Sequence, residues 1–224
     1  MKSAVRRSLA RVGLKIVRAT PSDRGIPEFG RLLSEIQQHT LVTPDRLFRL
    51  YQFAKYASCI AGDIAELGVY RGGTARMLAS ACPGKRLMLF DTFAGLPAAD
   101  PTVDGHQGGD FSETSLPQVQ AFLSDCPNVE WFPGFFPDSA AGNEARRFSL
   151  VYVDGDLYQS TKDALAWFYP RLVTGGVMVF DDYGSPRCEG VQRAIAEFIA
   201  TTPNYPIQPA PNQCVLIKGT PAPS

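Results

Sequence analysis

Short apolar segments that favour β-strands alternate along this chain with segments whose apolar residues recur at helical spacing. Connections of this length between strands are helical crossovers, which produce a parallel sheet with helices packed on it. In 224 residues the pattern predicts one α/β domain or two very small ones. The expected strands are residues 63–67, 86–90, 128–132, 150–153, 177–180 and 213–218, and the expected helices are residues 44–58, 72–82, 160–172 and 191–200.

The chain is electrically neutral, with 22 basic and 22 acidic residues, but its charges are unevenly distributed. Residues 1–20 contain six basic residues and no acidic residue, which leaves a net charge of −6 on the remaining 204 residues. Neutrality argues against a nucleic-acid-binding domain, which is normally basic, and leaves that question open only for residues 1–20.

The basic segment 1–20 also has apolar residues at helical spacing, at positions 5, 9, 12 and 16. We expect an N-terminal helical extension that lies on the surface or joins the subunits of a homo-oligomer; the alternative is a membrane-surface anchor. With the linker that follows, residues 1–40 are assigned to this arm, residues 41–219 to the folded domain, and residues 220–224 to a disordered tail.

Several protein classes are excluded by what the sequence lacks. No apolar run approaches the roughly 18–20 residues of a membrane span. Arg11 and Lys15 interrupt the apolar stretch that a secretory signal would need. The five cysteines are widely spaced and form no CxxC pair, which is typical of a reduced, cytoplasmic protein without a disulfide or zinc framework.

Residues 92–118 are rich in glycine and proline and show little periodicity. Loops of this length are uncommon in compact domains and are usually lids or binding loops. We therefore predict a functional lid near residues 92–118; the alternative is a floppy insertion.

The sequence Glu-Leu-Gly-Val-Tyr-Arg-Gly-Gly at residues 66–73 joins the first expected strand to a helix. Glycine permits a tight turn, and the free N–H groups at the helix start make this the usual position of a nucleotide-like cofactor. The spacing matches neither the GxGxxG of dinucleotide-binding proteins nor a phosphate loop, so a cofactor with an amino-acid cation would suit Glu66. Asp91, at the end of the next strand, is placed to bind both hydroxyls of a ribose.

Acidic residues follow two further strands: Asp154 ends the strand at 150–153, and Asp181 and Asp182 end the strand at 177–180. Both strand ends open on the same edge of a parallel sheet, where these carboxylates would repel one another unless a cation or protons intervened. Oxygen ligands without His or Cys favour a hard ion, above all Mg²⁺. The alternative is that these acids merely cap helices or are solvated. The nearby Asp156 either has such a structural role or orients the substrate or a metal-bound water.

Taken together, the motifs resemble those of the macrocin O-methyltransferase (TylF-like) family of S-adenosylmethionine-dependent enzymes, over roughly residues 41–198. The matching segments, in the family's order, are residues 66–73, 91–97, 153–161, 169–172, 175–183 and 190–195. The resemblance implies the class I methyltransferase fold, a Rossmann-like, doubly wound seven-stranded sheet whose last strand is antiparallel. It also implies Mg²⁺ dependence and a hydroxyl acceptor, often on a sugar of a natural product or polysaccharide.

The same resemblance implies roles for particular residues. The S-adenosylmethionine site would include Glu66 and Gly68 at the methionine end, Asp91 at the ribose and Phe136 near the adenine, together with Tyr70, Gly72 and Asp154. The metal ligands would be Asp154, Asp181 and Asp182. Some relatives carry a Lys or His base three residues after the first metal acid, where this chain has Leu157. The candidates for the base are therefore Asp154, Asp156 and a metal-bound hydroxide.

The sequence thus predicts a Mg²⁺-assisted, S-adenosylmethionine-dependent O-methyltransferase that acts on a hydroxyl of a sugar or natural product, with the lid excluding water. One alternative is a non-catalytic, methyltransferase-like protein that binds partners through its basic arm. The other is a metal-dependent phosphoester hydrolase, for which Arg187 would be the one basic residue near the site able to stabilise a phosphate.

Overall fold

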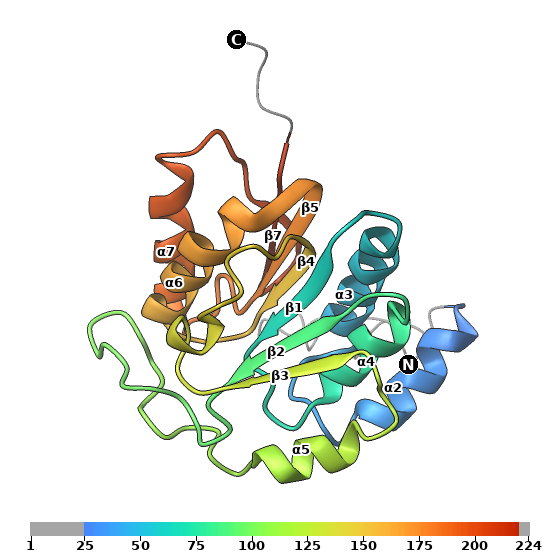
Figure 1. Ribbon diagram of the computed structural model, residues 1–224. Coiled ribbons are helices and arrows are strands. Elements are labelled where there is room, and N and C mark those ends of the chain that lie inside the picture. Colours follow the sequence, from blue (N-terminus) through green and yellow to red (C-terminus); the bar gives the residue numbers. More distant parts are fainter. Residues whose placement is uncertain (1–24, 220–224) are drawn as a thin grey trace, which may run out of the picture.

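The computed structural model describes residues 25–219, which form a seven-stranded sheet in the order β3-β2-β1-β4-β5-β7-β6 (Figure 1). Strand β7 runs antiparallel to both of its neighbours, and the five strands before it in that order are parallel. The expected sheet with an antiparallel last strand is therefore confirmed. The strands are β1 (Asp63–Leu67), β2 (Leu87–Asp91), β3 (Val129–Pro133), β4 (Phe148–Val153), β5 (Leu172–Asp181), β6 (Ile207–Ala210) and β7 (Gln213–Ile217).

Helices cover both faces of this sheet, as a doubly wound fold requires. Figure 1 shows α6 and α7 together on one side and α2, α3 and α4 on the other. The α-helices are α2 (Pro27–Ile36), α3 (Pro44–Ser58), α4 (Gly73–Ala81), α5 (Leu116–Phe122), α6 (Tyr158–Phe168) and α7 (Glu189–Ile199), and the short 3₁₀ turns are η1 (Asp138–Ala140) and η2 (Tyr169–Arg171).

The central strands are apolar throughout because both of their faces are covered. In β4 every residue is buried. Leu150 and Tyr152 face the apolar cluster that contains α2, α3 and α4, whereas Val151 and Val153 face the cluster that contains α6 and α7. This period-2 alternation places two hydrophobic cores on one strand and fixes its register.

The helix expected at residues 160–172 is shifted in the structure. It begins at Tyr158, whose N–H donates to Oδ1 of Asp104 in the segment 92–115 at 2.8 Å, so the side chain of a residue distant in sequence caps its first turn. It ends at Phe168, because Pro170 follows in a 3₁₀ turn, and β5 begins at Leu172. The last turn of the expected helix is therefore a 3₁₀ turn followed by the first residue of a strand.

The assignment of residues 1–40 to an arm and linker is wrong for its last part. Helix α2 buries Phe29, Leu33 and Ile36 in the same core as α3 and α4, so the folded domain already includes it. The predicted basic arm at residues 1–20 and the predicted tail at residues 220–224 lie outside the described residues. Within residues 25–219, no helix is both long enough and apolar enough to cross a membrane.

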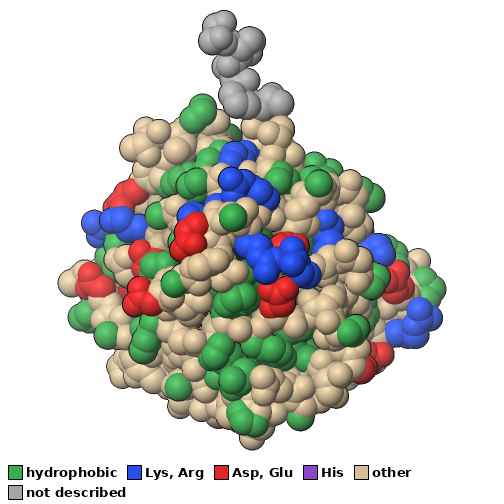
Figure 2. Space-filling model, viewed as in Figure 1, with side chains coloured by type: hydrophobic (Ala, Val, Ile, Leu, Met, Phe, Trp, Pro, Cys, Tyr) green, Lys and Arg blue, Asp and Glu red, His purple; other side chains and the backbone are tan. Residues whose placement is uncertain are grey.

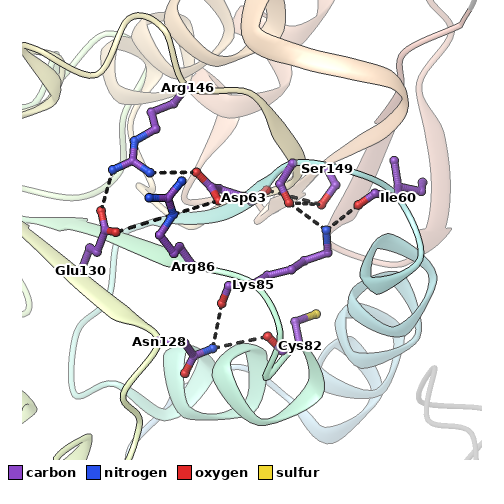
Figure 3. Close-up of polar contacts among 10 residues, drawn as sticks. Ile60, Asp63, Cys82, Lys85, Arg86, Asn128, Glu130, Arg146 and Ser149 are labelled. Carbon is purple, nitrogen blue, oxygen red and sulfur yellow. Dashed lines mark hydrogen bonds and ion pairs between the residues drawn. The ribbon is translucent and has the colours of Figure 1, made fainter.

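A network of charges holds the amino-terminal edge of the sheet together (Figure 3). Asp63, at the start of β1, pairs with Arg86 before β2 at 3.2 Å and with Arg146 before β4 at 3.1 Å. Arg146 also reaches Glu130 of β3 at 3.1 Å. In the space-filling view, basic and acidic side chains are intermingled over this face of the molecule (Figure 2). These pairs align four strand starts, and each contributes little because it is partly exposed.

A close backbone approach makes Gly68 indispensable. Its φ is +88°, and a Cβ at this position would overlap the carbonyl oxygen of Asp154 at the end of β4. We expect Gly68→Ala to lower the free energy of unfolding by about 3 kcal/mol or more. Gly142→Ala is the matched control, because Gly142 has a φ of +82° with nothing within 4 Å of its Cβ position. It should cost only about 1–2 kcal/mol in urea denaturation, and equal costs for the two variants would contradict this account.

Candidate active site

The carboxyl ends of the parallel strands and the segment 92–115 enclose a cavity of about 430 Å³. In Figure 1 this segment, in yellow-green, loops out beside the strand ends, where the sequence predicts a lid. The residues predicted for the site that line this one cavity are Gly68, Tyr70, Asp91, Phe136, Asp154, Asp156, Asp181 and Asp182. Glu66 and Gly72 are not among its lining residues.

Asp91 fixes the backbone of the turn that follows β1. Its Oδ2 accepts hydrogen bonds from the N–H groups of Val69 at 2.6 Å and Tyr70 at 3.0 Å, and its Oδ1 accepts one from Phe93 at 2.7 Å. Tyr70 has a φ of +51°, which costs a non-glycine residue free energy and persists here because Asp91 holds its amide. Oδ1 of Asp91 accepts only one of these hydrogen bonds and keeps a lone pair that a ribose hydroxyl could use.

Glu66 lies behind the cavity wall rather than in it. It is fully buried and accepts a short hydrogen bond from the hydroxyl of Thr74, a residue that does line the cavity. Its Oε2 has no hydrogen-bond partner. Burial raises the pKa of Glu66 well above its usual range, and the Thr74 hydrogen bond offsets only part of that shift.

Gly72 has a packing role in this structure. Its φ is +83°, and a Cβ there would lie 2.8 Å from Cγ1 of Val119 in α5. It allows the short helix α5 to pack against the start of α4, so its predicted part in cofactor binding would be indirect.

Phe136 belongs to an aromatic wall. Its ring is stacked on Phe168 with centroids 5.1 Å apart and packs edge-on against Phe90 at 5.5 Å. The neighbouring Phe135 also lines the cavity and is 61% exposed, and no sequence pattern pointed to it.

The acidic residues cluster, but in a different grouping from the expected one. Oxygen atoms of Asp154, Asp156 and Asp182 lie within 4.8 Å of one another. Asp181 is not part of this group. Its carboxylate is 2.8 Å from the guanidinium of Arg46 in α3, and it accepts a hydrogen bond from Gln213 of β7 at 3.1 Å.

Burial and mutual repulsion change the acidity of these groups. Burial, followed by the charges of Asp181 and Asp182, raises the pKa of Asp154 well above its usual range. The same effects raise the pKa of Asp156 to about 8. For Asp181 burial raises the pKa to about 7, and Arg46 opposes that rise. A bound cation would oppose all three shifts, because it favours the charged form of each carboxyl group.

The cluster suits a hard divalent cation. All of its donors are carboxylate oxygens, the ligands that Mg²⁺ prefers. The buried Oδ2 of Asp181 has no hydrogen-bond partner, although Arg46 lies close to it.

The segment 92–115 contributes side chains to the site that sequence reasoning missed. His106 is buried in the cavity wall, with Nδ1 3.0 Å from Oδ2 of Asp110. Tyr70 donates its hydroxyl proton to Glu113 at 2.9 Å, and the hydroxyl of Thr114 donates to the carbonyl of Tyr70 at 2.6 Å. These bonds attach the segment directly to the glycine turn.

Two further missed residues, Arg46 and Cys188, also line the cavity, as does Arg187, which the sequence places near the site only for the hydrolase alternative. Arg46 is separated from its acidic partners by more than 130 residues, so no local pattern could have revealed the pairing. His106 offered a weak signal, as one of two histidines in the chain and the one inside the predicted lid.

Comparison with known sequences gives a family match over most of the chain. Residues 34–216 match the family described as Macrocin-O-methyltransferase (TylF). The chain is 34% identical over 170 residues to 8-demethyl-8-(2,3-dimethoxy-α-L-rhamnosyl)-tetracenomycin-C 4′-O-methyltransferase of Streptomyces olivaceus, covering 67% of this chain and 64% of that enzyme. It is 32% identical over 172 residues to mycinamicin III 3″-O-methyltransferase of Micromonospora griseorubida, covering 67% of each. The chain thus spans about two thirds of the length of these relatives.

Solved structures share the fold. The O-methyltransferase NovP superposes with a TM-score of 0.69 at 25% identity, covering 81% of this chain and 83% of NovP. The calicheamicin methyltransferase CalS11 superposes with a TM-score of 0.65 at 21% identity, covering 98% of this chain and 93% of CalS11.

The raised pKa of Asp156 predicts how stability depends on pH without a metal. Its folded-state pKa of about 8 lies above the unfolded value of about 3.9, so stability that is fully present below about pH 3.9 is lost progressively as the pH rises to about 8. In EDTA, we expect Asp156→Asn to gain roughly 1–3 kcal/mol relative to the wild type between pH 5 and pH 9 and to exceed it at pH 9, because neighbouring carboxyls share the titration.

Urea denaturation at both pH values measures this difference. Asp138→Asn is the control, since Asp138 is exposed and lies outside the cavity. A variant less stable than the wild type at pH 9, or a gain of the same size at pH 5, would refute the prediction.

Proposed function

The chain belongs to the macrocin-O-methyltransferase (TylF) family, and from that premise we propose that it transfers a methyl group from S-adenosylmethionine to a sugar or natural-product hydroxyl with the help of Mg²⁺. One observation carries this proposal. The glycine turn with Asp91 and the carboxylate cluster of Asp154, Asp156 and Asp182 open into the same cavity. A cofactor held by the turn would therefore face an acceptor held by the cluster.

The turn after β1 supplies the cofactor side of the cavity. Asp91 can accept hydrogen bonds from ribose hydroxyls while it holds the turn. Phe135 and Phe136 offer an apolar surface for a purine ring. When bound, S-adenosylmethionine supplies a sulfonium-activated methyl group, so the protein must chiefly align donor and acceptor.

The carboxylate cluster supplies the acceptor side. Asp154, Asp181 and Asp182 would hold Mg²⁺, which when bound acidifies and orients a hydroxyl. Asp156 lines the same cavity and is the proton acceptor that we favour, because one oxygen of Asp154 already accepts a hydrogen bond from Tyr152 at 3.2 Å.

The acceptor class rests on the relatives. The name of the tetracenomycin enzyme gives a rhamnosyl-bearing substrate and a 4′-O position, and that of the mycinamicin enzyme gives a 3″-O position. A third relative, 27% identical over 180 residues, is demethyldecarbamoylnovobiocin O-methyltransferase of Streptomyces niveus. A deoxysugar, free as a nucleotide conjugate or attached to an aglycone, is therefore the first acceptor class to test.

The direct test is a methyl-transfer assay. The protein is incubated with S-adenosylmethionine, Mg²⁺ and a panel of deoxysugar nucleotides and glycosides, and S-adenosylhomocysteine and methylated product are detected by mass spectrometry. Product formation supports the proposal. Failure of the folded protein to bind S-adenosylmethionine in calorimetry would overturn it.

Asp91 should control cofactor affinity. We expect Asp91→Asn to weaken S-adenosylmethionine binding by about 10–100-fold, because a hydrogen bond to a charged group is worth roughly 1.5–3 kcal/mol. Isothermal titration calorimetry measures the change, and Asp138→Asn should bind like the wild type. Unchanged affinity in a folded Asp91→Asn protein would remove Asp91 from the cofactor site.

Metal dependence provides a separate prediction. EDTA should abolish methyl transfer and Mg²⁺ should restore it, while Asp182→Asn should raise the Mg²⁺ concentration needed for half-maximal activity at least about tenfold. Full activity in EDTA would exclude the Mg²⁺ part of the proposal and leave methyl transfer itself standing.

A further inference from the structure

Asp156 belongs to two groups of side chains that are close enough together to hold a metal ion. In one it joins Asp154 and Asp182; in the other it joins His106 and Cys188, again with one donor atom from each residue within 4.8 Å of the others. We propose that His106, Asp156 and Cys188 form a second cation site that takes a thiophilic divalent ion such as Zn²⁺.

The ligand set distinguishes the two sites. Imidazole nitrogen, thiolate sulfur and carboxylate oxygen bind Zn²⁺ at about 2.0–2.3 Å, whereas Mg²⁺ prefers oxygen ligands. Tetrahedral coordination at these bond lengths places donor atoms roughly 3.3–3.8 Å apart. Sγ of Cys188 is already 3.9 Å from Oδ1 of Asp156, so ion binding requires only small side-chain movements.

Asp110 can select the tautomer of His106 that an ion would require. Nδ1 of His106 lies 3.0 Å from Oδ2 of Asp110. When Nδ1 donates its proton to that carboxylate, Nε2 keeps a free lone pair for an ion, which is the usual arrangement behind a metal-binding histidine. The guanidinium of Arg187 also lies on the Nδ1 side, 3.4 Å away, and does not occupy Nε2.

The backbone already holds the two segments of the site together. The N–H of Gly105 donates to the carbonyl of Arg187 at 2.8 Å, which sets the next residues, His106 and Cys188, side by side. The N–H of Gly190 donates to the carbonyl of Val103 at 2.9 Å. An ion would therefore join the lid to the start of α7 at an existing contact, with little cost in ordering the chain.

The proposed ion has a consequence for the neighbouring cluster. It would bind the carboxylate of Asp156, the residue proposed above to accept the proton. It would also link the segment 92–115, through His106, to Cys188 at the start of α7. Zn²⁺ is therefore expected to inhibit methyl transfer, although the site itself can be tested without cofactor or acceptor.

Co²⁺ serves as a spectroscopic probe for the site. Metal-free protein is titrated with Co²⁺ at pH 8 in excess Mg²⁺, since a coordinating thiol must lose its proton and Mg²⁺ fills the oxygen site. We expect one Co²⁺ per chain, with thiolate-to-cobalt charge-transfer absorption that disappears when Zn²⁺ is added. Cys188→Ser should abolish this absorption. His106→Asn and Asp110→Asn should each weaken Co²⁺ binding by about 10–100-fold.

Two further cysteine variants test whether the absorption comes from a thiol other than Cys188. Cys59→Ser and Cys126→Ser remove thiols outside the cavity and should keep the signal. Circular dichroism and thermal unfolding establish that each variant is folded. If Cys188→Ser does not fold, the Co²⁺ affinity of His106→Asn decides the outcome. The proposal is overturned if wild-type protein shows no charge-transfer absorption, if folded Cys188→Ser keeps it, or if His106→Asn binds Co²⁺ like the wild type. None of these results bears on methyl transfer.

Discussion

Four carboxyl groups are buried or half-buried at one edge of the sheet, and the free-energy cost of placing them there is the constraint on which the surrounding structure depends. Burial and the charges of the neighbouring carboxylates raise the pKa values of Asp154 and Asp156. Arg46 from α3 and Gln213 from β7 offset part of this cost through Asp181. Helix α3 and the antiparallel strand β7 are therefore parts of the site as well as parts of the scaffold.

The segment 92–115 is bonded to the turn after β1 through Tyr70 and Arg71. Tyr70 stands in a left-handed conformation held by Asp91, and its hydroxyl and carbonyl groups bond to Glu113 and Thr114 at the end of the lid. A ligand that presses on the turn would act on the lid through Tyr70. The other end of the lid contacts the start of α7 through Gly105, so the segment is attached at two points.

Much of the fold could be predicted from local patterns, and the exceptions have identifiable physical causes. Strands β1, β2, β3 and β7 were placed within about one residue, because continuous apolar runs flanked by turns are strong signals. Helix α5 is only seven residues long and strand β6 four, too short for a period to emerge. The start of α6 at Tyr158 depends on a hydrogen bond to Asp104, which is 54 residues away and so cannot be recognised from the residues around Tyr158.

The sequence by itself determined the parallel sheet, the glycine turn and the acidic residues at the strand ends, because each of these is written in consecutive residues with a fixed spacing. Only the tertiary structure decided which groups meet. It paired Arg46 with Asp181, buried Glu66 where it accepts a hydrogen bond from Thr74, and brought His106 close to Cys188. These contacts join segments that lie far apart in the chain, apart from the pair formed by Glu66 and Thr74. Their geometry follows from how the helices and the lid pack on the sheet, which local periodicity does not encode.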